Sequence, residues 1–197
     1  HSMAGRIDEA IVEFRRSLGI NPDQKDANTG LGLMLMEQHQ PEAALTYLSR
    51  AVELDSEDPV TLMRLGWAHE KMESVADAQK AFEKAVALDS SMVEAYTSLA
   101  RIVSGAGEHQ RAIELLQRAI ELRPDDARAH FNLGVAFVNS GDYRRAAQAY
   151  ERVIEINPTH TRAHLYLSDI YAKLGRGAES KALERRAREL TLAEGQS

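Results

Sequence analysis

A unit of about 34 residues repeats through this chain of 197 residues and restricts the fold more than any other feature of the sequence. Leucine occupies the seventh position of every unit, and alanine or serine occupies the twentieth. The register continues without an insertion. A sequence period of roughly 20 to 50 residues indicates stacked supersecondary units rather than one globular core.

Five complete units fit this register, at 25–58, 59–92, 93–126, 127–160 and 161–194. The stretch 4–24 reads as the second helix of a preceding unit whose first helix is missing. Either the natural chain starts there, or the stretch belongs to a longer array or parent protein, which is the interpretation we favour. Residues 1–3 are interpreted as a tag remnant and residues 195–197 as a short tail.

Each unit contains two stretches of helical periodicity. In the unit 127–160, Leu133, Ala136 and Phe137 recur at helical spacing, and the turn residues 139–142 interrupt them. A second apolar stripe follows and ends before Pro158, which cannot continue a helix. Small residues at the eighth and twentieth positions allow the two helices to approach closely. The sequence therefore predicts an all-α array of antiparallel helix pairs.

The pattern resembles that of the tetratricopeptide repeat (TPR) family. The matching residues are clearest in one unit, where they are Phe131, Asn132, Leu133, Gly134, Phe137, Ala146, Tyr150 and Pro158. The resemblance covers all five units, from 25 to 194, and implies a right-handed α-solenoid, the TPR superhelix. It implies little about function, because the family serves many unrelated processes.

The last unit departs from the pattern at positions that are apolar or alanine elsewhere. Ser180, Glu184 and Arg188 occupy these positions. A terminal unit of a solenoid needs a polar outer face. We therefore expect a helix over about 178–191 that caps the array.

The resemblance also implies where a partner binds, because the first helices of TPR units line a concave groove. Transferring the groove positions one by one gives twelve candidate binding residues in this chain. They are Leu33, Met36, Met63, Arg64, Trp67, Arg101, Arg128, Phe131, Asn132, Val135, Arg162 and Tyr166.

Many of these residues are apolar, and a contiguous exposed apolar patch indicates a binding surface. Trp67 is the only tryptophan, a residue type favoured at energetic hot spots, and methionine adapts to varied partners. The arginines can pair with carboxylates through their forked geometry. The predicted ligand is a peptide or protein segment with apolar anchors and at least one acidic group. The alternative is that Trp67 and the methionines are half-buried structural residues.

Some TPR domains hold a C-terminal carboxylate with a set of lysine, asparagine and arginine side chains. Only Asn132 and Arg162 stand in matching places here. Thr97, Arg101 and Tyr166 replace other members of the set. We therefore do not expect this carboxylate clamp.

The sequence offers no catalytic motif. The chain has no cysteine, which excludes thiol catalysis and thiolate metal sites. His160 and His164 have a spacing that could place two imidazoles on one helix face, but they read as repeat packing residues. We therefore predict no catalytic residue, no metal, no cofactor and no enzymatic activity.

Charge and hydropathy limit the partner class. The net charge of −6 argues against a nucleic-acid partner, and the absence of a long apolar run argues against direct membrane insertion. Unit 25–58 has two basic and seven acidic residues, whereas 161–197 has seven basic and five acidic residues. This asymmetry would favour head-to-tail self-association. The expected location is cytoplasmic, with the periplasm or attachment to a membrane through a missing region left open.

The sequence thus predicts a non-catalytic interaction module, an adaptor or scaffold that binds a peptide or protein segment in its groove. One alternative is the substrate-recognition region of a larger enzyme, such as a glycosyltransferase. Another is a self-assembling structural scaffold. A designed consensus array is disfavoured, because the fifth, ninth and twelfth positions vary strongly between units.

Overall fold

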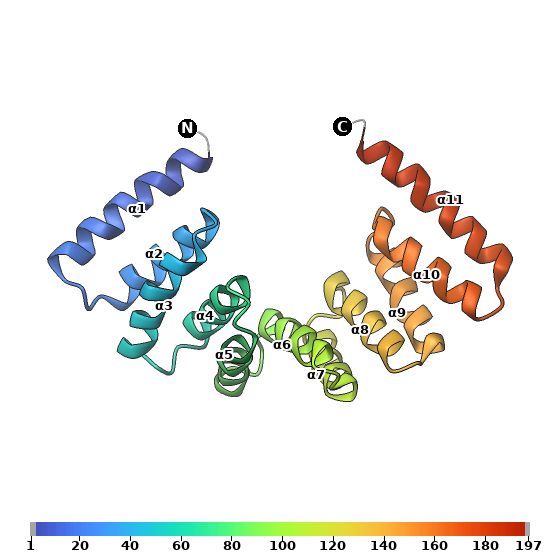
Figure 1. The fold of residues 1–197 in the computed structure, drawn as a ribbon, viewed down its shortest axis with the longest axis horizontal. Helices are drawn as coiled ribbons and strands as arrows, with labels where there is room; N and C mark the ends of the chain where they lie inside the picture. Colours follow the sequence, from blue (N-terminus) through green and yellow to red (C-terminus); the bar gives the residue numbers. More distant parts are fainter. Residues whose placement is uncertain (1–2, 196–197) are drawn as a thin grey trace. The chain divides into compact units, whose positions relative to one another are not determined.

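A computed structural model describes residues 3–195, and all regular secondary structure in this range is α-helical. The predicted all-α array of helix pairs is confirmed. The first two residues of the expected tag remnant and the last two of the expected tail lie outside the described range. The helices (Figure 1) are α1 (Met3–Ile20), α2 (Lys25–Glu37), α3 (Pro41–Leu54), α4 (Pro59–Lys71), α5 (Val75–Leu88), α6 (Val93–Gly105), α7 (His109–Leu122), α8 (Ala127–Asn139), α9 (Tyr143–Ile156), α10 (Thr161–Lys173) and α11 (Gly177–Glu194).

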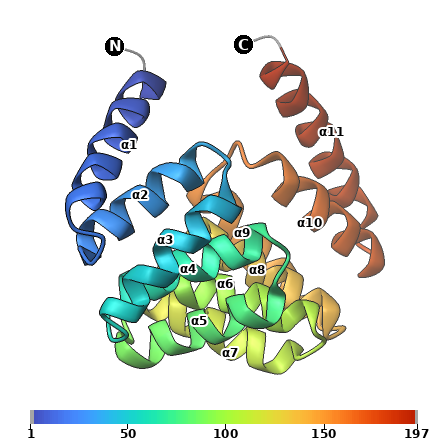
Figure 2. The same cartoon turned by 60° about the vertical axis from the view of Figure 1, so that its left-hand side comes forward.

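The chain divides into two compact units, residues 1–95 and 96–197. In the first unit, α2 pairs with α3 and α4 pairs with α5, while α1 packs on α2 and α3 packs on α4. In the second unit, α8 pairs with α9 and α10 pairs with α11, while α7 packs on α8 and α9 packs on α10. Figure 2 shows the same helices turned by 60°. Within each unit these helices therefore contact their neighbours in sequence, as stacked repeats require.

The helix pairs close over small residues. A Cβ atom built on Gly66 would lie 2.7 Å from the Phe82 ring, and one built on Gly134 would lie 2.7 Å from the Tyr150 ring. Both rings are fully buried. The eighth position is therefore small because the large side chain at the twenty-fourth position occupies the space of its Cβ.

In the last unit, serines replace the small residues. Ser168 donates a hydrogen bond to the carbonyl oxygen of Ser180 at 3.0 Å, and the two hydroxyl oxygens are also 3.0 Å apart. Both side chains are buried. Ser180 therefore belongs to the interior of the helix pair, whereas Glu184 and Arg188 are exposed.

The first helix of every unit ends in the same turn. The residue two places beyond the helix has a positive φ, and the next N–H bonds to a carbonyl five residues earlier, as Gln40 does to Leu35 at 2.9 Å. Glycine fills the positive-φ position in the last three units. His39 (φ 57°) and Glu73 (φ 58°) fill it in the first two.

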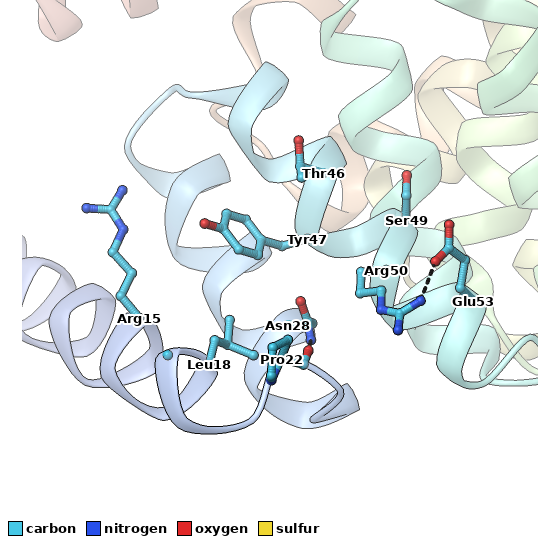
Figure 3. Close-up of a pocket in the computed structure, with 10 residues that line it drawn as sticks. Arg15, Leu18, Pro22, Asn28, Thr46, Tyr47, Ser49, Arg50 and Glu53 are labelled. Carbon is cyan, nitrogen blue, oxygen red and sulfur yellow. Dashed lines mark hydrogen bonds and ion pairs between the residues drawn. The ribbon is translucent and has the colours of Figure 1, made fainter.

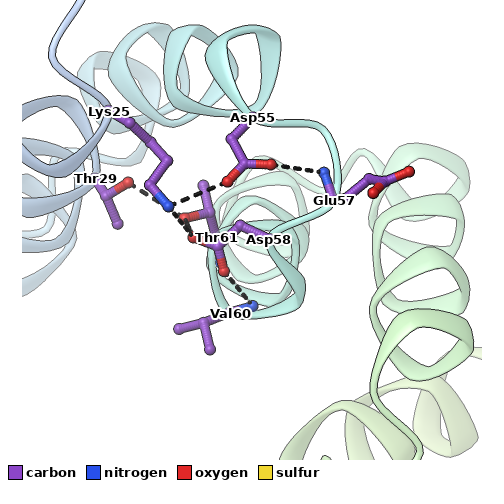
Figure 4. Close-up of polar contacts among 7 residues, drawn as sticks. All are labelled: Lys25, Thr29, Asp55, Glu57, Asp58, Val60 and Thr61. Atoms are coloured by element: carbon purple, nitrogen blue, oxygen red, sulfur yellow. Dashed lines mark hydrogen bonds and ion pairs between the residues drawn. The ribbon is translucent and has the colours of Figure 1, made fainter.

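A polar network joins the N-terminal ends of α2 and α4 (Figure 4). Lys25 Nζ lies 3.2 Å from an oxygen of Asp55 and 3.4 Å from an oxygen of Asp58. Asp58 accepts hydrogen bonds from the Thr61 hydroxyl and from backbone N–H groups, and Thr61 Oγ1 lies 3.2 Å from Thr29 Oγ1. These bonds fix the spacing of the two first helices that carry candidate binding residues.

The same bonds set the charge state of Asp58. Burial opposes its ionisation, but the Thr61 hydroxyl, two backbone N–H groups and the Lys25 ammonium outweigh burial and lower the pKa of Asp58 below 3.8. The hydrogen bond to Asp55 and the charge of Asp58 raise the pKa of Lys25. Asp58 and Lys25 are therefore both charged at neutral pH.

Candidate functional site

The structure places the twelve predicted binding residues in three classes of exposure. Met63 is buried, with 9% of its surface exposed. The half-buried residues are Leu33, Met36, Arg64, Trp67, Phe131, Asn132 and Val135. The exposed residues are Arg101, Arg128, Arg162 and Tyr166. Eleven of the twelve are thus open to contact, and Met63 belongs to the packed interior.

In the first unit, α2, α3 and α4 enclose a pocket of about 280 Å³. Leu33, Met36 and Leu48 supply its apolar surface, together with the half-buried indole of Trp67. The remaining lining comes from Glu37, Arg64 and Lys71 of the two first helices and from His39 in the turn after α2. The pocket therefore combines an apolar interior with polar groups that can orient a bound segment.

In the second unit, α6, α7 and α8 enclose a pocket of about 200 Å³. Arg101, Ser104, Asn132 and Asn139 contribute polar groups, and Val135 is one of its apolar residues. Asn139 Nδ2 lies 3.4 Å from Ser104 Oγ. Desolvation lowers the pKa of Arg101, which nevertheless stays protonated at neutral pH. Four of its eight lining residues thus carry polar side chains, and the rest of the lining is apolar or glycine.

The two pockets occupy equivalent places in the repeat. Seven of the eight residues that line each pocket are related by a shift of two repeat units. The equivalent pairs are Leu33 and Arg101, Met36 and Ser104, Glu37 and Gly105, Leu48 and Leu116, Arg64 and Asn132, Trp67 and Val135, and Lys71 and Asn139. One backbone arrangement thus forms both hollows, and the side chains alone give them different chemistry.

Between α8 and α10 the equivalent place is filled with rings. Tyr166 has the repeat position of Arg64 and Asn132, and it stacks on Tyr150 with centroids 5.6 Å apart. Phe131 meets Tyr166 edge to face at 5.4 Å. The Arg162 guanidinium lies 5.3 Å from the Phe131 ring centre. Burial, reinforced by Tyr166, raises the pKa of Tyr150, which therefore stays neutral.

Four first-helix cations differ in their ion pairing from four arginines of the second helices. On the second helices, glutamate three residues further on pairs with Arg50, Arg118, Arg152 and Arg186 at 2.7 to 3.2 Å. In residues 3–195, no carboxylate lies within ion-pair distance of Arg64, Lys71, Arg128 or Arg162. These four cations therefore differ from Lys25 of α2, which is paired with Asp55 and Asp58.

A further hollow of about 570 Å³ lies between α1 and α3, outside the predicted groove (Figure 3). Tyr47 stands in it, with Arg15 and Leu18 of α1 among the lining residues. Arg50 also lines it and is paired with Asp23 and Glu53. Sequence reasoning missed this hollow. The available signal was Tyr47, which stands where the other complete units have alanine or leucine.

The histidine pair of α10 has structural contacts. His160 Nδ1 accepts the N–H of Ala163 at 3.1 Å and caps the helix, and His164 is buried with its Nδ1 3.1 Å from the carbonyl oxygen of His160. Across the described residues, no cluster of three His, Asp or Glu side chains has a geometry that could hold a metal ion. None of the described helices is both long and apolar enough to span a membrane.

The repeat geometry matches a known sequence pattern. A model described as TPR repeat matches residues 106–141, and models described as tetratricopeptide repeat match residues 2–60, 60–92 and 127–160. The chain belongs to the tetratricopeptide repeat family. The resemblance drawn from the repeat residues is confirmed.

Similar TPR chains include two much longer curated proteins. Anaphase-promoting complex subunit 3 of Schizosaccharomyces pombe is 24% identical over 127 residues, which is 64% of this chain and 19% of that protein. Tetratricopeptide repeat-containing protein trd-1 of Caenorhabditis elegans is 25% identical over 122 residues, which is 61% of this chain and 16% of that protein. The chain spans less than a fifth of the length of these relatives.

Solved structures of similar size share the fold. A crystal structure of MamA is 28% identical with a TM-score of 0.79, over 85% of this chain and 98% of that chain. The structure of YrrB, described as a TPR protein with an unusual peptide-binding site, is 23% identical with a TM-score of 0.75 over 90% of this chain and 91% of that chain. These likenesses support the assignment of a TPR solenoid.

Proposed function

We propose that this TPR chain is a non-catalytic binding module that holds a peptide or an extended protein segment on the surface formed by its first helices. The observation that carries this proposal is the pair of equivalent pockets, one in each compact unit. Both are built from first-helix positions, and seven of the twelve predicted residues line them.

The energetics favour an apolar anchor with polar positioning groups. Fully burying one Leu, Phe or Met side chain contributes about 1.5–3 kcal/mol. Leu33, Met36 and Trp67 offer such a site, and the helices around them are already ordered by the repeat core. Little ordering entropy is then lost on the protein side. The uncompensated arginines provide charge-assisted hydrogen bonds to the ligand.

The relatives agree with this proposal. Anaphase-promoting complex subunit 3 is, by its name, part of an assembly, and YrrB is described as having a peptide-binding site. YrrB is also described as a TPR protein.

A peptide selection tests the proposal directly. Phage displaying random 12-residue peptides would be selected on the chain, and the enriched peptides synthesised and titrated by calorimetry. Trp67→Ala is expected to weaken the selected peptides by roughly tenfold to a hundredfold, in line with the loss of a buried aromatic contact. Trp67 is also the only tryptophan, so its emission reports binding at the pocket.

Tyr47→Ala is the matched control. It also removes a half-buried aromatic side chain from the first unit, but from the hollow between α1 and α3. Circular dichroism would establish that both variants are folded. The proposal is wrong if no peptide is enriched, or if Tyr47→Ala weakens binding while Trp67→Ala does not.

A further inference from the structure

The hollow between α1 and α3 in the first unit has the dimensions of a small-molecule site. Its volume of about 570 Å³ lies within the roughly 300–1,000 Å³ of pockets that hold such ligands. Lining residues come from α1, the turn after it, α2 and α3, so the hollow is bounded on several sides (Figure 3). A Cβ atom built on Gly19 would meet no atom within 4 Å. Four of the five other second helices carry glutamate at this repeat position, namely Glu53, Glu121, Glu155 and Glu189.

Asn28 supplies a hydrogen-bond acceptor to this hollow. Only 3% of its surface is exposed, and its Nδ2 donates to the carbonyl oxygens of Pro22 at 2.8 Å and Gln24 at 2.9 Å. These two bonds use both N–H groups of the amide. Among residues 3–195, no donor reaches the Oδ1 atom. A buried acceptor without a partner costs free energy, so a ligand that brings an O–H or N–H group to Oδ1 gains from the contact.

The apolar part of the lining suits a flat ring. The half-buried Tyr47 side chain stands in the hollow, and Leu18 and Pro22 also line it. The other complete units have alanine or leucine at the Tyr47 position, namely Ala81, Leu115, Ala149 and Leu183. Aromatic rings pack favourably on one another in offset or edge-to-face arrangements. An aromatic ring therefore matches a feature that only this unit has.

The charged side chains of the hollow differ in what they leave for a ligand. Arg50 lies 2.5 Å from Asp23 and 2.7 Å from Glu53, so carboxylates of the chain already compensate it. Arg15 is exposed and has no carboxylate within ion-pair distance among the described residues. Figure 3 shows Arg15 and Glu53 at opposite sides of the hollow. A ligand carboxylate therefore finds its partner on the α1 side.

We propose that this hollow binds a small aromatic carboxylic acid that carries an O–H or N–H group at the far end of its ring. The donor group bonds to Asn28 Oδ1, the ring packs on Tyr47, and the carboxylate pairs with Arg15. The hollow lies outside the surface formed by the first helices. This inference is therefore a second site, which does not depend on the proposed peptide-binding function.

Three related probes test the chemistry of the site by amide NMR on the isotope-labelled chain. Para-hydroxyphenylpropionate has the ring, the acid and the donor, and it should cause saturable shifts of the Gly19 backbone N–H and the Asn28 side-chain amide. Its expected Kd is on the order of 1 mM, as befits a ligand of about 12 non-hydrogen atoms. Phenylpropionate lacks the hydroxyl, and tyramine has an ammonium group in place of the carboxylate. Each should bind about tenfold more weakly.

Variants of α1 test the position of the carboxylate. Arg15→Glu should weaken para-hydroxyphenylpropionate by about tenfold or more and strengthen tyramine, and added salt should reduce both changes. Arg16→Glu is the matched control, because Arg16 is exposed on the same helix and does not line the hollow. It should change either Kd by about twofold at most. Tyr47→Ala should remove the saturable shifts, with circular dichroism to establish that the variant is folded.

Several results would overturn the inference. One is the absence of saturable shifts at Gly19 and Asn28 with up to about 10 mM para-hydroxyphenylpropionate. Others are equal binding of the three probes, or a loss of affinity in Arg16→Glu as large as that in Arg15→Glu. Retention of the shifts in folded Tyr47→Ala would also contradict it. None of these results bears on the peptide selection, which depends on Trp67 in a different pocket.

Discussion

Replacing Glu73 with glycine should stabilise the protein. Glu73 holds φ at 58° directly after the C-cap of α4, a left-handed conformation that is costly for residues with a Cβ. Its N–H bonds to the carbonyl of Glu70 at 3.0 Å, and the following N–H bonds to that of His69 at 2.9 Å. This turn has the same geometry as the turns in which Gly107 and Gly141 take the same place.

The expected magnitude follows from two opposing effects. Relief of the left-handed conformation contributes about 1–2 kcal/mol. Glycine also increases the conformational entropy of the unfolded chain, which costs about 0.4–1 kcal/mol. The net gain is therefore between about 0 and 1.6 kcal/mol, with a midpoint of about 0.8 kcal/mol. Since a change of about 1 kcal/mol moves the Tm of a chain of this size by about 2–4 °C, the midpoint corresponds to an upward shift of about 2–3 °C.

Urea denaturation followed by circular dichroism measures this change, with Glu73→Ala as the control. Alanine removes the same exposed side chain but keeps a Cβ at positive φ, so it should change stability little. His39→Gly should behave like Glu73→Gly, because its φ is 57°. The reasoning is refuted if glycine is no more stabilising than alanine at position 73.

Two further predictions concern the helix pairs and the polar network. Gly134→Ala should destabilise the chain by about 1–3 kcal/mol, because the new Cβ would lie 2.7 Å from the Tyr150 ring, whereas Gly177→Ala, with open space around its Cβ, should not; thermal denaturation compares them. Asp58→Asn should lower stability at neutral pH. Because folding lowers the Asp58 pKa, its contribution is present above about pH 3.8 and is lost as the pH falls through the folded value. The difference in urea midpoint between the chain and Asp58→Asn should therefore shrink at about pH 3, and a constant difference would contradict the assignment.

Much of the fold could be predicted because every unit repeats nearly the same pattern of large and small residues at the positions where its two helices meet. Leucine at the seventh position and a small residue at the eighth, opposite a large one at the twenty-fourth, define how a pair closes. The structure realises this rule in Gly66 against Phe82 and in Gly134 against Tyr150. The end of the last helix was less predictable. It runs to Glu194 rather than to about 191, because no glycine or proline interrupts it before Gly195.

The sequence predicted which side of each first helix carries the candidate binding residues, but it did not predict how far each residue is buried. Helical spacing shows which side of a helix a residue faces, and it cannot show how far a neighbouring helix covers that residue. Met63 is buried for this reason, whereas Phe131 at the same repeat position is half-buried. The hollow around Tyr47 depends on the separation of α1 and α3, which only tertiary packing determines. The Ser168–Ser180 contact likewise requires the two helices to be placed first.

The equivalence of the two pockets separates the residues that give each pocket its chemistry from the residues that hold the helix pairs together. The residues that distinguish the pockets, such as Trp67 and Val135, are not the residues that close the helix pairs, such as Gly66 and Gly134. Substitutions at the distinguishing positions are therefore expected to change the chemistry of a pocket at small cost in stability. The lining of one pocket could be rebuilt in the other by exchanging a few side chains at a constant offset of two repeat units.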